Sequence, residues 1–180
     1  MMEIHYEIVT ADNLPKNGLD AFVRTQPVRS VWRRIGGYYQ ITEHPFTDDW
    51  PPEQKRKKAA ELRSDALTVF GAFDGGTLIG FAGIRNQSVG NRLILDTMHV
   101  SQPYRRSGIG KALFRQAEAE AIRRGAEELY ISAESAVETV AFYQAMGAEF
   151  TDAAIPEMVE AEPFDVQMVK KLSGKNQKIL

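Results

Sequence analysis

The chain has 180 residues, a length typical of one domain that builds its own core. Hydrophobic residues make up 43% and charged residues 26%, which are ordinary values for a globular protein. The net charge of −2 excludes a global basic field for nucleic acid or an anionic membrane, so any anion site must be local. The absence of cysteine excludes disulfides, thiol catalysis and cysteine-bound metals.

The composition predicts a protein that binds neither nucleic acid nor membrane. The N-terminal residues do not resemble a signal peptide, and no apolar run approaches the length of a membrane span. We therefore expect a cytoplasmic protein with a single domain over residues 1–172 and a flexible C-terminal tail over 173–180.

The first third of the chain carries weak secondary-structure signals. Residues 4–8 alternate between apolar and polar, which predicts a strand with one buried face. Residues 14–25 have a weak helical pattern, and residues 27–50 read as an irregular segment rich in aromatic side chains. A helix is predicted over 53–64, because acidic residues followed by proline mark a helix start.

The middle of the chain gives clear β signals. Residues 66–73 and 77–85 are apolar runs rich in β-forming residues, and Asp74-Gly75-Gly76 between them predicts a hairpin. A turn over 86–90 leads into a third strand over 93–100. These three strands predict an antiparallel meander.

The last part of the chain predicts a crossover. Apolar residues recur every four positions over 108–124, which indicates an amphipathic helix, and a short strand follows at 129–133. A strand, helix and strand in this order make two parallel strands with a right-handed connection. A second helix over 136–146 and a final strand over 164–170 complete an α/β (α+β) fold with a mixed, mostly antiparallel sheet flanked by helices.

The most informative segment is the loop and helix start at residues 104–111. A helix N-terminus presents unpaired N–H groups and partial positive charge, so it favours anions. Gly108 and Gly110 permit a close approach of the main chain to a ligand, and Arg105 and Arg106 add local positive charge. The segment therefore predicts a pyrophosphate-binding site.

A dinucleotide-binding fingerprint is the first alternative for this site. Gly108 and Gly110 match its first two glycines, but Leu113 stands where the third should be. Glu134, at the end of the next strand, lies near the ribose-binding position and keeps this alternative open. The histidines are isolated from one another and from acidic clusters, so no metal site is predicted.

Two motifs carry a resemblance to a known family. Arg105-x-x-Gly108-x-Gly110 resembles the acyl-CoA pyrophosphate loop of the GNAT (GCN5-related N-acetyltransferase) superfamily. Phe142-Tyr143-x-x-x-Gly147 resembles its second signature, in the helix after the fifth strand, and the resemblance spans about residues 67–150. It implies the GNAT fold, in which the parallel strand pair is splayed, and acetyl-CoA as cofactor.

The resemblance implies a cofactor site built largely from main chain. In the family, loop amides hold the pyrophosphate and the end of the central strand pairs with the pantetheine. The corresponding residues here are Met98, Val100, Arg105, Arg106, Ser107, Gly108, Ile109, Gly110 and Lys111. Ala136 stands where the family often has asparagine. Its neighbour Ser135 either replaces that asparagine or caps the helix, since it has capping-box spacing to Glu138.

The resemblance also implies two catalytic residues. Tyr143 matches the tyrosine that often protonates the departing thiolate, and packing in the core is its alternative role. Asp96 matches an acid that faces the acceptor amine. It would hold the ammonium, act as a base through water, or make only a structural hydrogen bond. His99 is one residue off that face and is expected to point into the core or the opposite layer.

The acceptor pocket of the family comes mainly from the N-terminal helices and their loop, here residues 28–50. Tyr38, Asp48 and Asp49 are the candidates, because aromatic rings and acids suit a cationic amine; packing and helix capping are the alternatives. The implied reaction is acetyl transfer to the primary amine of a small molecule or peptide, by direct attack in a ternary complex. A non-catalytic acyl-CoA-binding sensor or regulatory module is the other interpretation, and a homodimer is left possible.

Overall fold

The computed structural model describes residues 3–173. Its elements, in chain order, are β1 (Ile4–Ile8), β2 (Gln26–Ile35), β3 (Tyr38–Asp48), α1 (Pro52–Leu62), β4 (Leu67–Asp74), β5 (Thr77–Arg85), β6 (Arg92–Val100), the short 3-10 helix η1 (Gln102–Tyr104), α2 (Ile109–Arg123), β7 (Glu128–Ala133), α3 (Val137–Ala145), β8 (Glu149–Phe150), α4 (Pro156–Ala161) and β9 (Val166–Lys171). The tail predicted over 173–180 lies outside the described residues except for Ser173.

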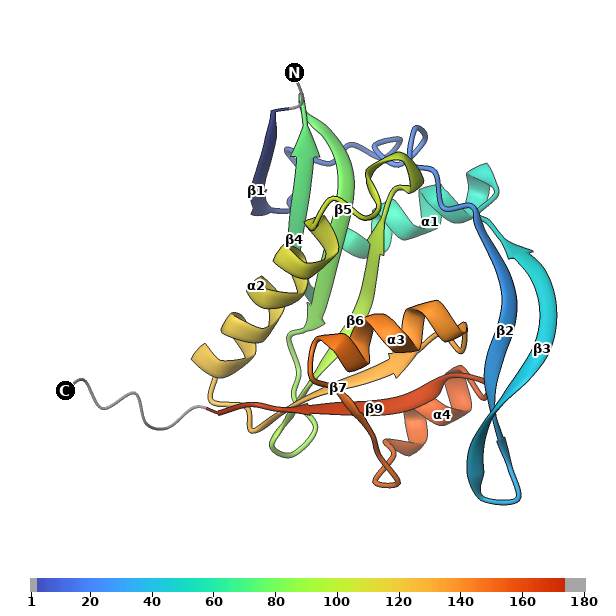
Figure 1. Cartoon of the computed structure of the whole chain (residues 1–180). Coiled ribbons are helices and arrows are strands. Elements are labelled where there is room, and N and C mark those ends of the chain that lie inside the picture. The colour runs from blue at the N-terminus through green and yellow to red at the C-terminus, as the bar shows by residue number, and fades with distance from the viewer. Residues whose placement is uncertain (1–2, 174–180) are drawn as a thin grey trace.

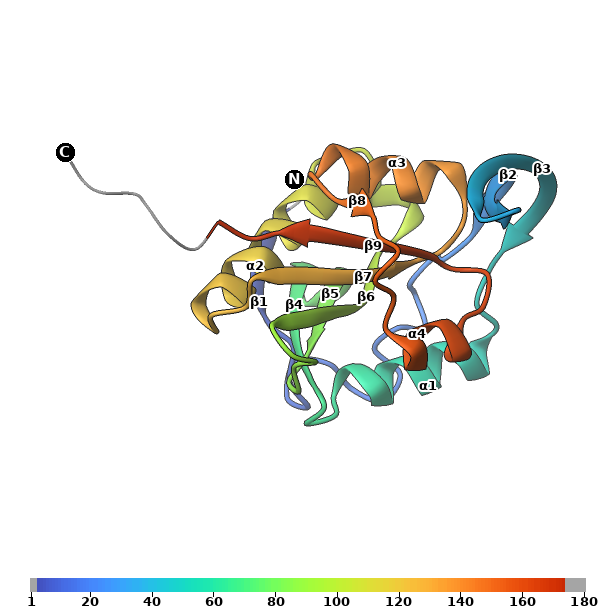
Figure 2. The same cartoon turned by 90° about the horizontal axis from the view of Figure 1, so that it is seen from below.

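A mixed sheet forms the centre of the molecule. Its strand order is β1-β4-β5-β6-β7-β9-β8, and only the β6–β7 pair is parallel. Helices α2 and α3 cover one face of the sheet, and α1 and α4 cover the other (Figure 2). The largest core cluster lies beneath α2, where Leu113, Phe114 and Ala117 are wholly buried. This arrangement confirms the predicted fold class, the meander and the parallel crossover.

The parallel strands separate partway along their length. β6 and β7 pair only from Arg92 opposite Glu128 to Leu95 opposite Ile131. Beyond that point the two strands diverge (Figure 1), while β6 keeps its pairing with β5 as far as Val100. The end of β6 therefore has an open edge, which is the feature that a splayed strand pair provides.

Residues 27–50 are not irregular, as the sequence had suggested, but form the long hairpin of β2 and β3. Gly36 and Gly37 make its turn with φ angles of 59° and 87°, a left-handed conformation that glycine adopts without steric cost. The hairpin contacts the loop after β7: the main-chain N–H of Trp32 donates to the main-chain oxygen of Ser135 over 2.8 Å. A β-ribbon, rather than the helices expected from the family, therefore stands beside the parallel strands.

Smaller predictions also need correction. Residues 14–25 form successive turns instead of a helix, because Pro15 and Gly18 interrupt it, although Leu14 is buried. β1 is a strand as predicted, but it lies at the sheet edge and its Tyr6 is 39% exposed.

The predicted capping box before α3 does not form. Ala136 is the N-cap, without a side-chain hydrogen bond, and the Ser135 hydroxyl instead accepts from Arg33 over 2.6 Å. The chain after α3 also contains two elements that the sequence did not reveal, β8 and α4, and β9 starts at Val166 rather than at residue 164.

Candidate active site

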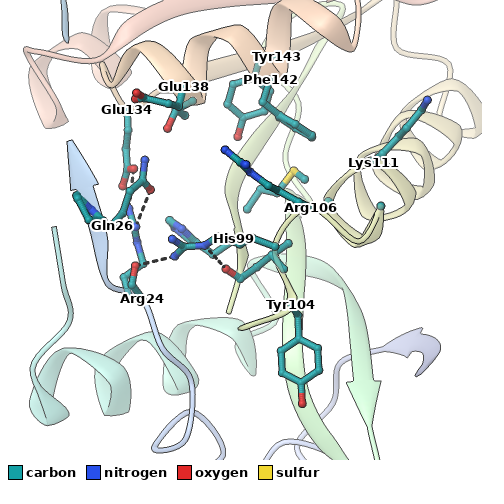
Figure 3. A pocket seen from close by; sticks show the side chains of 17 residues that line it. Arg24, Gln26, His99, Tyr104, Arg106, Lys111, Glu134, Glu138, Phe142 and Tyr143 are labelled. Atoms are coloured by element: carbon teal, nitrogen blue, oxygen red, sulfur yellow. Dashed lines mark hydrogen bonds and ion pairs between the residues drawn. The ribbon is translucent and has the colours of Figure 1, made fainter. Parts of the chain in front are cut away.

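A cleft of about 740 Å³ opens where β6 and β7 separate (Figure 3). Its walls come from the end of β6, the loop and first turn of α2, the end of β7 with α3, and the segment that leads into β2. The lining residues are Arg24, Gln26, Pro27, Met98, His99, Val100, Tyr104, Arg105, Arg106, Gly108, Gly110, Lys111, Glu134, Glu138, Thr139, Phe142 and Tyr143.

One end of the cleft is an anion-binding loop before α2. Arg106 and Gly108 both have left-handed main-chain angles, with φ of 63° and 87°, and Gly108 is the N-cap of α2. Alternation of this kind turns successive N–H groups toward one concave surface, and the helix N-terminus adds its partial positive charge. A Cβ on Gly108 would meet no protein atom within 4 Å, so the space in front of it is open to a ligand. The loop fits the pyrophosphate of an acyl-CoA.

The sequence predicted that Arg105 would offer its positive charge to a ligand, but its guanidinium is used within the protein. Its guanidinium donates to three main-chain oxygens, those of Val100 at 3.0 Å, Thr25 at 2.9 Å and Arg24 at 2.8 Å. Arg105 therefore ties the anion-binding loop to the end of β6 and to the segment before β2. The side chains left to contribute positive charge at this end are those of Arg106 and Lys111, which line the cleft.

A buried arginine organises the opposite end. Arg24 is 1% exposed, and its guanidinium donates to Asp48 at 2.6 Å, Glu134 at 2.7 Å and Gln26 at 3.0 Å. It also lies over the Trp50 ring, 5.7 Å from the centroid. We refer to Arg24, Gln26, Asp48 and Glu134 as the Arg24 cluster. It connects the ends of β3 and β7 at the wall of the cleft.

Tyr143 lies between these two ends. Its ring is 7% exposed, and Figure 3 shows its hydroxyl pointing into the cleft. Burial raises the pKa of Tyr143, and the carboxylates of Glu134 and Asp165 raise it further. The phenol is therefore a neutral hydrogen-bond donor at physiological pH.

His99 occupies the floor of the cleft, on the α1 side of β6. It packs edge-on against Trp50, with ring centroids 4.8 Å apart, and against Phe81. Burial lowers the pKa of His99 well below 6.5, and nearby cations, first among them Arg24, lower it further. The imidazole is thus neutral at physiological pH and touches both the aromatic core and the cleft.

Asp96 is not brought to the cleft. A β-bulge pairs Leu95 with Ile84 and Thr97 with Gly83, so Asp96 is the extra residue and does not share the face of Met98. Its carboxylate instead accepts from Arg85 at 2.6 Å, and Arg85 also contacts Glu157 of α4.

The predicted acceptor residues also separate in space. Tyr38 is 77% exposed at the tip of the hairpin, at the opposite end of the ribbon from Asp48. Asp49 accepts a hydrogen bond from the N–H of Trp50 and does not line the cleft. Asp48 does not line the cleft either, but it forms an ion pair with Arg24, which does.

Most of the predicted cofactor residues converge in the cleft. Those that line it are Met98, Val100, Arg105, Arg106, Gly108, Gly110 and Lys111. Ser107 is exposed, and its hydroxyl donates to the Tyr104 oxygen, which shapes the loop. Ile109 is buried in the core beneath α2, so only its main chain belongs to the helix start.

The sequence missed the Arg24 cluster as a unit. Arg24 stands in a segment without periodicity, and the sequence predicts for Glu134 only a ribose-binding role. Glu134 comes immediately after a predicted strand, and this position was the signal that could have placed it where β6 and β7 separate. Among residues 3–173 no group of three or more histidine and acidic side chains could hold a metal ion. In the same part of the chain, no helix has the length and apolarity to cross a bilayer.

The splayed strands, the left-handed loop before α2 and the tyrosine in the cleft define an α/β acyltransferase domain. The chain belongs to the acetyltransferase (GNAT) family, whose family model matches residues 35–148. The family that the sequence motifs implied is thereby confirmed.

Solved structures of similar fold match most of the chain. Nourseothricin acetyltransferase has a TM-score of 0.69 at 19% identity, covering 94% of this chain and 99% of its own. The PaiA N-acetyltransferase from Thermoplasma acidophilum, in complex with coenzyme A, has a TM-score of 0.57 at 17% identity and covers 94% and 99%. The ribosomal-protein-S18-alanine N-acetyltransferase from Escherichia coli has a TM-score of 0.59 at 16% identity and covers 99% of each chain. No curated protein sequence matches this chain significantly.

Proposed function

We propose that this protein transfers the acetyl group of acetyl-CoA to a primary amine of a small molecule or peptide. The observation that carries the proposal is the position of Tyr143, whose hydroxyl points into a cleft with an anion-binding loop at one end and the Arg24 cluster at the other. The cofactor is that of the family, and the relative from Thermoplasma acidophilum contains coenzyme A.

The residues of the cleft suit an acyl-CoA. The main-chain N–H groups around Gly108 and the start of α2 would hold the pyrophosphate, and Arg106 and Lys111 would add positive charge. The open edge of β6 at Met98 and Val100 would pair with the amide groups of the pantetheine arm. When bound, acetyl-CoA supplies an activated thioester carbonyl and a thiol leaving group.

Tyr143 would hold the proton that the leaving sulfur needs. Because burial raises its pKa, the phenol keeps its proton at neutral pH. It would therefore stabilise negative charge on sulfur by donating a hydrogen bond to it. The neutral imidazole of His99 adds no positive charge to repel an incoming ammonium group.

Two features of the chain support direct attack in a ternary complex. The sequence has no cysteine to carry an acyl group. The cleft has two chemically different ends on either side of Tyr143, so it can hold the cofactor and the acceptor together.

The test is a screen of primary amines with release of free thiol as readout and mass spectrometry of the product. Wild-type protein should acetylate at least one amine, and the Tyr143→Phe variant should do so much more slowly. Tight binding of coenzyme A without transfer to any amine would instead identify the non-catalytic sensor.

A further inference from the structure

The cleft has opposite charges at its two ends. Figure 3 shows Arg106 and Lys111 on one side of the cleft and Glu134 and Glu138 on the other. The basic side adjoins the helix start that attracts phosphate. The acidic side adjoins the hairpin, away from the proposed cofactor loop, so the groups there are available to the second substrate.

The Arg24 cluster carries a net negative charge. One guanidinium meets two carboxylates, those of Asp48 and Glu134, so these three charges sum to −1, while the Arg105 guanidinium next to them belongs to the other end of the cleft. Arg24 itself is 1% exposed, and its charge is held in place by both partners. A net charge in a partly enclosed site attracts an opposite charge more strongly than it would in open water.

The carboxylates keep oxygens for a ligand. Arg24 contacts one oxygen of each, Oδ2 of Asp48 and Oε2 of Glu134. Within residues 3–173 the second oxygen of each carboxylate makes no hydrogen bond to protein, although a carboxylate accepts about four. The Glu134 side chain is 45% exposed, against 31% for Asp48, so Glu134 is the more accessible group.

Glu134 also lies close to the reacting centre. Its carboxylate is near enough to Tyr143 to raise the pKa of the phenol, and both residues line the same cleft. An ammonium group bound at Glu134 would therefore lie in the same cleft as the hydroxyl that we propose to serve the leaving sulfur.

We infer that Glu134 binds the positively charged amine of the acceptor, that Asp48 completes this ammonium site, and that Arg24 is the residue that positions both carboxylates. The inference rests on the proposed function and specifies its acceptor as a cationic amine. The ammonium group would donate to the second oxygens of Glu134 and Asp48, and one of its protons would pass to solvent water before the neutral nitrogen attacks the thioester carbonyl. Arg24 is 1% exposed and its two terminal nitrogens pair with three side chains, so we assign it a positioning role.

The Glu134→Gln variant tests the ammonium site. It keeps the shape of the side chain and removes the charge, so the KM for the acceptor should rise roughly 10- to 100-fold, the loss expected for one hydrogen bond to a charged group. The kcat should change less than about threefold, and the affinity for coenzyme A should be unchanged. Glu134→Asp should recover part of the acceptor affinity.

A matched control removes a carboxylate elsewhere. Glu149, in the short strand β8, is exposed and does not line the cleft. Glu149→Gln should leave the acceptor KM unchanged, which separates a local effect from the change in overall charge.

Arg24→Lys tests the positioning role. A lysine ammonium cannot reproduce the fork that holds two carboxylates and Gln26, so the acceptor KM should rise about 10-fold even though the positive charge remains. The same KM-against-kcat split should appear as in Glu134→Gln. An equal loss of acceptor and coenzyme A affinity would show that Arg24 supports only the fold.

A binding measurement separates this inference from the proposed function. Calorimetric titration of wild-type protein and Glu134→Gln uses 1,4-diaminobutane as the probe, beside the kinetics with the best acceptor of the screen. Acetylation with an unchanged acceptor KM in Glu134→Gln would overturn the ammonium site and leave the transferase standing. Diamine binding that depends on Glu134, without any acetylation, would support the site and refute the transferase. Neither binding nor acetylation would overturn both.

Discussion

Arg105 donates a hydrogen bond from its guanidinium to the main-chain oxygen of Arg24 over 2.8 Å. Two arginines that belong to opposite ends of the cleft are thus joined directly, one through its side chain and the other through its main chain. The side chain of Arg24 continues from there to Asp48 and Glu134. The anion-binding loop and the proposed ammonium site are therefore parts of one connected structure.

This connection predicts that Arg105→Lys impairs both ends at once. A single ammonium group cannot satisfy the oxygens of Val100, Thr25 and Arg24 together, and each unsatisfied buried group costs about 1–3 kcal/mol. We expect the free energy of unfolding to fall by about 2 kcal/mol in urea denaturation, with weaker binding of both substrates. Arg106→Lys is the control and should keep wild-type stability. Equal stability of the two variants would contradict the connection.

Gly108 has two separable roles, which a matched pair of substitutions distinguishes. Gly108→Ala and Gly125→Ala each place a Cβ on a left-handed residue, with φ of 87° and 78°, and neither Cβ would meet a protein atom. Each should lower the free energy of unfolding by about 1–2 kcal/mol through main-chain strain. Only Gly108→Ala should also weaken coenzyme A binding in calorimetry, because its Cβ would stand where the pyrophosphate approaches. The same affinity for both variants would remove Gly108 from the cofactor site.

Tyr143→Phe should lower kcat by roughly 100-fold with unchanged affinity for coenzyme A, since removal of a general acid typically costs 10²–10⁴-fold. Because burial raises the pKa of Tyr143, the wild-type phenol keeps its proton up to at least about pH 9, and the kcat profile should show no decline below that pH from loss of this proton. Tyr130→Phe is the control and should keep the wild-type kcat, because Tyr130 lies outside the cleft, is buried beneath α4 and pairs with Gln167. Wild-type turnover in Tyr143→Phe would return this residue to a packing role.

The sequence could predict the cofactor end of the site because its signals are local. Gly108 and Gly110 stand two residues apart at a strand-to-helix junction, and the strands on either side have clear apolar patterns. The Arg24–Glu134 pair joins residues 110 positions apart, and no local pattern encodes such a contact.

The hairpin of β2 and β3 was missed for a different reason. Gly36 and Gly37 are a strong turn signal, but most of β3 is exposed on both faces, so it lacks the alternation that marks a half-buried strand. The β-bulge at Asp96 is likewise invisible in the sequence. Strict alternation would have put Asp96 on the face of Met98, and the extra residue moved it away.

Asp165 should make stability depend on pH near neutrality. Burial raises the pKa of its carboxyl from 3.8 to about 6, and neighbouring Glu162 and Glu134 add to the shift. A carboxyl with a higher pKa in the folded state favours folding when protonated. Its contribution is therefore complete below about pH 4 and is lost as the pH rises through about 6.

Asp165→Asn removes this penalty and should stabilise the protein at pH 7.5 by about 2 kcal/mol more than at pH 4, since one pKa unit corresponds to about 1.4 kcal/mol. The amide oxygen can still accept from the Ser132 hydroxyl, which bonds to Asp165 at 3.0 Å. Urea denaturation at the two pH values measures the difference. If Asp165→Asn and the wild-type protein differ in stability by the same amount at both pH values, Asp165 does not titrate in this range.

Asp96→Asn should reduce stability without affecting the acceptor. The Asp96 carboxylate is 15% exposed and accepts from Arg85 at 2.6 Å, on the side of β6 where Arg85 also contacts Glu157. The amide oxygen can still accept from Arg85, but the hydrogen bond loses its charge on the acceptor side, and we expect a loss of about 1 kcal/mol in the free energy of unfolding. The acceptor KM should stay within about twofold of wild type, because no atom of Asp96 lines the cleft. An acceptor KM raised roughly 10-fold at unchanged stability would restore Asp96 as the group that holds the amine, and would displace Glu134 from that role.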